Sequence, residues 1–176
     1  MADPKRLVIL KQLTAYLESE VSIANGYQHD LAGRVFRGRL YFDSRMEVPM
    51  VSLLENPDPD RFPPEAGHNG RQAPEQMVGL AMLVQGFAAE DKVNPTDPAY
   101  LLEADVTKAL AKIAQRTDPR GVPTDPDIYL LGGKLDRLVF EPSVVRPPTE
   151  QVSDTAFFWK RVTLRYADDP NDPYRL

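Results

Sequence analysis

Apolar side chains recur along the chain at helical spacing in two places. Asp3-Pro4 provides a helix start, and the apolar stripe that follows consists of Leu10, Leu13, Leu17 and Val21. Asn25-Gly26 is expected to stop this first helix. Asp97-Pro98 repeats the start, and the second stripe consists of Leu102, Val106, Ala109, Leu110 and Ile113. The pattern therefore predicts two amphipathic helices, the second running to about Arg116.

Alternating apolar and polar positions predict strands between and after these helices. Residues 34–42 are predicted as one strand with Phe36, Leu40 and Phe42 on its core face, and Arg37 and Arg39 on its charged face. Residues 48–55 are expected to pair with it as an antiparallel hairpin, across a short polar turn at residues 43–47. Residues 155–166 form the clearest strand. One face of that strand carries Phe158, Val162, Leu164 and Tyr166, and the other carries Phe157, Trp159, Arg161, Thr163 and Arg165.

The run at residues 75–87 has no polar face, which fits either a central strand covered on both sides or a buried helix. A strand is favoured because Gly79 and Gly86 would each cost a helix about 1 kcal/mol. Residues 117–126 are expected to be loop, residues 128–140 short strand pieces broken at Gly132-Gly133, and residues 142–148 extended. Together these elements predict one α+β domain, an antiparallel or mixed sheet with two main helices packed on it.

Prolines are concentrated in particular segments of this 176-residue chain, which contains 17 of them. Residues 56–74 form a long proline-rich loop with almost no aliphatic side chain, and residues 168–176 form an acidic tail. A loop of this length within one domain is normally functional or disordered. The segment is either a solvated excursion or an arm that becomes ordered only against a partner.

Composition excludes several classes of chemistry. The chain has no cysteine and two histidines, His29 and His68, and no apolar run reaches the ~20 residues of a membrane span. A net charge of -5 argues against wrapping nucleic acid as the main task. Gly132-Gly133-Lys134 lacks the spacing of a phosphate-binding loop, and no serine lies in a nucleophile-elbow context. We therefore expect a soluble protein, cytoplasmic when made, that is not an enzyme and needs no metal or cofactor.

Basic and aromatic side chains on the predicted strands suggest a binding surface instead. Trp159, with Arg161 and Arg165 on the same face, matches the composition that protein interfaces enrich, although loops of the same chain are an alternative cover for it. If the hairpin and the last strand share a sheet, their arginines form one positive surface that acidic groups of a second copy can meet; otherwise they are simply the solvated face of a sheet. A head-to-tail contact of that kind closes into a ring if the rotation permits. The predicted subunit or partner interface consists of Arg37, Arg39, Glu55, Arg61, Phe157, Trp159, Arg161 and Arg165.

Several of these segments, taken in order, carry a family resemblance. They are the opening helix, the Asn25-Gly26-Tyr27 turn, residues 35–39 (VFRGR), residues 49–55 (PMVSLLE) and the terminal residues 156–159 (AFFW). In this order they resemble the tail terminator proteins, also called tail completion proteins, of long-tailed bacteriophages. The resemblance covers most of the chain and is weakest in the proline-rich arm and at residues 117–152. No motif in it is a catalytic fingerprint.

The resemblance implies a small α+β subunit that forms a six-membered ring on the head-proximal end of the tail tube. Such a ring ends tube polymerisation and offers a surface to head-side neck or connector proteins. Its implied location is the virion, at the tail–neck junction, and the host cytoplasm during assembly. It implies no cofactor and no membrane, and DNA meets the ring only by passing through its lumen. The alternatives are a head-tail neck or stopper protein, or a small binding module or enzyme that uses the arm as a lid over a pocket containing His29 or His68.

Overall fold

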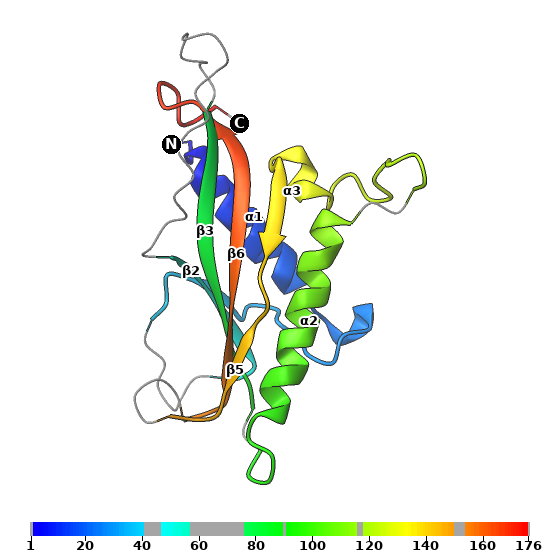
Figure 1. Ribbon diagram of the computed structural model, residues 1–176, viewed down its shortest axis with the longest axis vertical. Coiled ribbons are helices and arrows are strands. Elements are labelled where there is room, and N and C mark those ends of the chain that lie inside the picture. The colour runs from blue at the N-terminus through cyan, green and yellow to red at the C-terminus, as the bar shows by residue number, and fades with distance from the viewer. Residues whose placement is uncertain are drawn as a thin grey trace.

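The computed structural model describes residues 2–40, 47–56, 76–89, 91–115, 118–149 and 154–175. These residues form helices on one side of a single sheet (Figure 1), which confirms the predicted α+β fold. In chain order the elements are α1 (Lys5–Glu20), a 3-10 helix (Ile23–Asn25), β1 (Val35–Arg37), β2 (Met50–Glu55), β3 (Gln76–Phe87), α2 (Asp97–Ala114), α3 (Leu130–Gly133), β4 (Arg137–Phe140), β5 (Val144–Arg146) and β6 (Phe157–Asp168).

The sheet is mixed, in the order β1-β2-β3-β6-β4, and β5 also pairs with β6. Only the β1–β2 pair is parallel among the paired strands of the described chain. β3 and β6 pair along their full 12-residue length, from Gln76 opposite Asp168 to Phe87 opposite Phe157. The β3–β6 ladder is the centre of the sheet, and the remaining strands are shorter and pair with its two edges.

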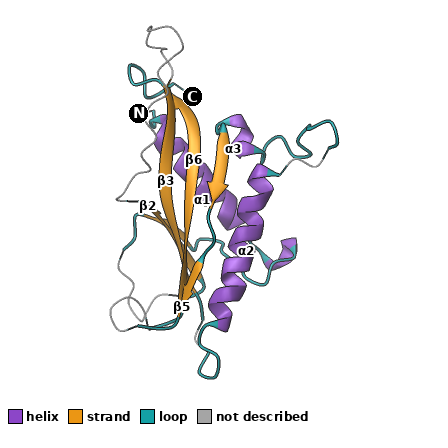
Figure 2. Ribbon diagram, viewed as in Figure 1, coloured by secondary structure: helices purple, strands orange, loops and turns teal. Residues whose placement is uncertain are grey.

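Both predicted helices form, and their apolar stripes face the sheet. α1 buries Leu10, Leu13 and Leu17, and α2 buries its whole predicted stripe. These side chains join the inner residues of β2, β3, β4 and β6 in one main core. Figure 2 shows the helices together on one side of the sheet. The apolar spacing therefore identified both helices and the faces that they bury.

Two sequence signals mark the ends of these helices. Proline lies at the first turn of α2, as predicted from Asp97-Pro98. α1 ends at Glu20, earlier than Asn25-Gly26. Asn25 nevertheless contributes to that end, because its Nδ2 donates hydrogen bonds to the carbonyls of Ser19 and Glu20, at 3.1 and 3.0 Å. Gly26 follows in the left-handed conformation, at φ 78°.

The central position predicted for residues 75–87 is confirmed by β3, which lies between β2 and β6. The prediction that both of its faces are covered is wrong for the described chain, because the helices cover one face only (Figure 1). Leu83 and Gln85 on the other face are partly exposed. Gly86 has a packing role: a Cβ there would lie 2.1 Å from a ring atom of Phe158.

The predicted hairpin at residues 34–55 is wrong. β1 has only three residues and runs parallel to β2, with Val35 opposite Val51. Gly38 ends the strand at φ 68°, which resets the alternation. Because Val35 lies opposite the buried Val51, it packs into the helix-side core, and Phe36 points to the opposite face. These faces are the reverse of the predicted assignment. Leu40 is 66% exposed, and residues 41–46, with most of the predicted turn, lie outside the described residues.

The segment at residues 128–140 is only partly as predicted. Its second half is β4, but its first half is a left-handed turn, with positive φ from Leu130 through Gly133, and not a strand piece. The predicted loop is confirmed at residues 118–126, and the extended segment contains β5. The acidic tail returns to the start of α1, where the Lys5 N–H donates a hydrogen bond to the Pro173 carbonyl at 2.8 Å.

Candidate functional site

The face of the sheet that points away from the helices is the candidate site, called the outer face below. Side chains alternate along a strand, so the pairing register assigns each strand residue to one face. Residues opposite one another, such as Leu83 and Arg161 or Gln85 and Trp159, point the same way. The outer face consists of Phe36, Met50, Ser52, Leu54, Met77, Gly79, Ala81, Leu83, Gln85, Phe87, Arg137, Val139, Val144, Arg146, Phe157, Trp159, Arg161, Thr163, Arg165 and Ala167.

Aromatic rings occupy one end of the outer face. Phe87 and Phe157 stack with centroids 5.9 Å apart, and the Phe157 and Trp159 centroids are 5.8 Å apart. Met50, Phe87 and Phe157 are each buried, while Phe36 and Trp159 pack against them and remain partly exposed. This is a second small apolar cluster on the side without helices. Trp159 is thus neither core nor fully covered by the described loops.

Arginines extend along the outer face from the aromatic cluster toward its other end. Arg161 follows Trp159 on the same face of β6, and Arg165 lies four residues further along, directly opposite Arg137 on the neighbouring strand. The Arg146 guanidinium is 5.7 Å from the centre of the Trp159 ring. The outer face therefore carries arginines from three strands: Arg137 of β4, Arg146 of β5, and Arg161 and Arg165 of β6.

Counter-charge is sparse on this surface. The strand residues assigned to the outer face include no aspartate or glutamate. Glu141 borders the face just past β4, where its N–H donates to the Arg161 carbonyl at 3.0 Å. Within the described ranges, no ion pair of 4.0 Å or less involves Arg137, Arg146 or Arg161. The outer face is therefore positive on a chain whose net charge is -5.

The structure brings together part of the predicted interface. Trp159, Arg161 and Arg165 share the outer face, as the alternation predicted. Arg39 joins its border, with its guanidinium 4.6 Å from the centre of the Phe36 ring. Phe157 shares the face but is only 2% exposed, so it supports the surface from below.

Two predicted residues are not on this surface. Arg37 lies on the helix side and donates a hydrogen bond to Thr14 Oγ1 at 3.2 Å. Glu55 is also on the helix side, where its carboxylate pairs with Arg6 at 2.7 Å. The position of Arg37 follows from the inverted faces of β1, and that of Glu55 from its place opposite Met82 of β3. Arg61 and nearly all of the proline-rich arm lie outside the described residues.

Sequence reasoning missed Arg137 and Arg146 as members of the positive surface. Residues 137–140 (RLVF) do alternate, and Leu138 is buried while Arg137 is exposed, so a usable signal existed at β4. Arg146 belongs to a three-residue strand among prolines, where alternation is too short to assign a face. Its place beside Trp159 depends on the tertiary pairing of β5 with β6.

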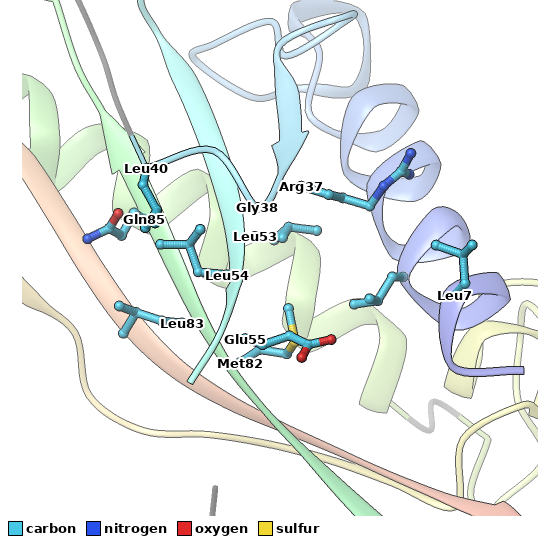
Figure 3. A pocket seen from close by; sticks show the side chains of 11 residues that line it. Leu7, Arg37, Gly38, Leu40, Leu53, Leu54, Glu55, Met82, Leu83 and Gln85 are labelled. Carbon is cyan, nitrogen blue, oxygen red and sulfur yellow. The ribbon is translucent and has the colours of Figure 1, made fainter. Parts of the chain in front are cut away.

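A groove opens at the edge of the sheet beside α1 (Figure 3). Its volume is about 610 Å³. It is bounded by α1, the end of β1 and strands β2 and β3, with a lining of Leu7, Leu10, Arg37, Gly38, Leu40, Leu53, Leu54, Glu55, Met82, Leu83 and Gln85. Leu54, Leu83 and Gln85 also belong to the outer face, so the groove is continuous with it.

Charges on the helix side, in contrast, are matched within the chain. Lys160, 3% exposed, lies 3.1 Å from the Glu103 carboxylate. Burial alone would raise the pKa of Glu103, but hydrogen bonds from Ser143, Thr107 and Lys160 and the charge of Lys160 together lower it below its ordinary value. The ion pair between the Glu103 carboxylate and the Lys160 ammonium group therefore links α2 to β6.

His29 is the histidine that an enzymatic interpretation would use. It lines a pocket of about 360 Å³ with Asp30 and Arg34 among the other lining residues. Its Nδ1 is 2.8 Å from Asp105 Oδ2, which also accepts hydrogen bonds from the N–H groups of Gln28 and His29. Among the described residues that line it, there is no serine, threonine, cysteine or lysine to act as a nucleophile. Asp105 thus holds the loop after α1 in place through these hydrogen bonds. Its contact with Nδ1 also fixes the orientation of the His29 ring, which a catalytic base would require.

In the part of the chain that the structure describes, no group of three or more potential ligands is arranged to hold a metal ion. Among the same residues, no helix combines the length and hydrophobicity needed to span a bilayer. No known protein-family model matches this chain, and no curated protein is similar to it in sequence.

Proposed function

We propose that this protein is a structural assembly subunit that binds other protein subunits through the outer face. The observation that carries the proposal is a positive, aromatic-centred sheet face on an otherwise acidic chain. Exposed tryptophan and arginine are the side chains that most often dominate protein interfaces. Within the described ranges Arg137, Arg146 and Arg161 have no ion pair of 4.0 Å or less, and a partner that brings carboxylates would supply one.

The sign of the outer face favours a head-to-tail contact between copies. Two outer faces placed together across a two-fold axis would set arginines against arginines, which opposes a symmetric dimer. A different, acidic surface of a second copy is complementary. The loop after α2 carries Asp118, Asp125 and Asp127 and extends away from the sheet (Figure 1). A contact between unlike surfaces of this kind builds a ring when its rotation closes.

Within this class, the proposed role is that of a phage tail terminator. The ordered resemblance of the opening helix, the Asn25-Gly26-Tyr27 turn and the terminal strand supports it, and a head-to-tail interface suits a ring of six copies. The ring would cap the head-proximal end of the tail tube, stop its polymerisation and receive the head-side neck proteins. A head-tail stopper with a similar ring is the alternative, and the two differ in whether the partner is the tube.

Electron microscopy of particles made from a phage genome lacking this gene tests the role. Overlong tail tubes without heads would support a terminator. Tubes of normal length beside leaking heads would replace that role with the neck protein. Normal infectious particles would reject both.

The pocket beside His29 and Asp105 motivates a second candidate, a small binding module or enzyme. That candidate predicts that His29→Ala abolishes biological function while leaving ring formation unchanged. Full complementation of the gene deletion by His29→Ala would reject it.

A further inference from the structure

The groove beside α1 lies in line with β1, where that strand stops and β2 continues (Figure 3). β1 pairs only with Val51–Leu53, while β2 runs on to Glu55. Gly38 donates its N–H to the Leu53 carbonyl at 2.9 Å and then, at φ 68°, directs the chain away. The groove therefore occupies the place in the sheet that a longer β1 would fill.

β2 presents backbone hydrogen-bonding groups toward this place. Alternate residues of a strand point their N–H and C=O to the same side. The Val51 N–H and the Leu53 carbonyl bond to the β1 segment, so those of Glu55 point to the same edge, next to the groove. In the described ranges no backbone hydrogen bond joins Glu55 to the residues that follow Gly38. With respect to the described residues, the edge of β2 is therefore unpaired at Glu55, and an unpaired strand edge is a template for an added strand.

The side chains around the groove favour an apolar, uncharged occupant. Leucines and a methionine supply most of the lining, from α1 on one side and from β2 and β3 on the other. The charged groups at the rim already have partners, Arg37 with Thr14 and Glu55 with Arg6. A charged occupant would lose water without gaining a free counter-charge.

We propose that the groove binds an extended, uncharged apolar segment of a partner protein, which adds a short strand to the edge of β2 below β1. Because β2 offers backbone groups at Glu55 alone, most of the affinity comes from apolar side chains in the leucine-lined groove. The continuity of the groove with the outer face through Leu83 and Gln85 allows one partner to use both. The site does not depend on a ring or on a tail, and its test uses the isolated full-length chain.

The probe is the pentapeptide amide Thr-Val-Leu-Val-Thr, with fluorescein attached to its N-terminus through an aminohexanoyl spacer. The protein is titrated into this probe and binding is followed by fluorescence anisotropy. Saturable binding is expected. Leu40→Glu should weaken binding at least tenfold, because Leu40 is 66% exposed at the groove and its loss leaves the core intact. The matched control is Leu101→Glu on α2, whose parent side chain is 44% exposed outside the groove, and it should bind like the parent protein. Leu7→Glu, on the α1 wall, provides a second groove variant if Leu40→Glu fails to fold.

A peptide N-methylated at its central residues separates strand addition from simple apolar binding. Losing a backbone hydrogen bond should weaken binding about three- to tenfold, and the Glu55 amide resonance should shift only with the unmethylated peptide. Absence of saturable binding below about 1 mM, or equal weakening by Leu40→Glu and Leu101→Glu, would overturn the site. Equal affinity for the two peptides would overturn strand addition and leave a groove for apolar ligands.

Discussion

The two faces of the sheet differ in whether their charged side chains have ion-pair partners within the chain. On the helix side, Lys160 is buried against Glu103, and Glu55 is paired with Arg6. On the outer face, Arg137, Arg146 and Arg161 have no ion pair of 4.0 Å or less within the residues that the structure describes. A charge that stabilises the fold is matched inside the chain, whereas a charge that serves binding is matched by the partner. The comparison indicates that one face maintains the subunit and the other is available for recognition.

The largest expected effect on stability is at β6, where substitutions of two neighbouring residues should have different consequences. Phe158→Ala should lower the free energy of unfolding by about 3–5 kcal/mol, because its fully buried ring leaves a cavity in the main core. Trp159→Ala, one residue along on the outer face, should keep the fold and weaken assembly instead. Urea denaturation measures the free energy of unfolding of both variants, and sedimentation measures the self-association of Trp159→Ala. If Trp159→Ala unfolds the subunit, the outer face is core and the comparison fails.

Breaking the buried pair on the helix side should have the next largest effect. Glu103→Gln removes the carboxylate that matches the charge of Lys160 and leaves its Nζ with the Glu141 carbonyl at 3.3 Å, which should cost about 3 kcal/mol at neutral pH. The pKa of Glu103 is lowered by folding, so its contribution is present above its ordinary value of 4.5 and is lost as the pH falls through the folded-state pKa. The stability gap between parent and variant should therefore narrow below about pH 4.5. Glu141→Gln, an exposed control, should show no such gap; a constant gap would contradict the assignment.

A smaller loss is expected where the two long strands pack closely. Gly86→Ala would place a Cβ against the buried ring of Phe158, at 2.1 Å before relaxation. Displacing that ring should cost about 1–3 kcal/mol. Gly26→Ala would not be a matched control, because Gly26 has a positive φ. Ala81→Gly, also in β3, controls for the propensity of the strand, and thermal unfolding of the three proteins gives the ranking.

The success of sequence reasoning followed the length of each element. α1, α2 and β6 are long enough for several repeats of their spacing, and their buried faces were predicted from it. β3 was predicted as a central strand from its length and apolar content, but without a polar face its exposed side was missed. β1 has three residues, and Gly38 interrupts the alternation that would have fixed its face and partner. A parallel pairing and the neighbours of Arg146 are tertiary facts that no local pattern encodes. The candidate site was therefore predicted on β6 and missed on β4 and β5.

The smallest effect on stability should accompany a clear effect on assembly. Arg161 is exposed on the outer face, so Arg161→Glu should change the free energy of unfolding by no more than about 0.5 kcal/mol. The same change reverses the charge in the middle of the proposed interface and should weaken self-association at least tenfold, as sedimentation measures. Association of the parent protein should also fall with added salt, since screening acts on exposed charges. Arg120→Glu, on the loop after α2, is the charge-matched control and would add to the acidic surface proposed as complementary. Equal weakening by both reversals would show that net charge, and not the outer face, controls assembly.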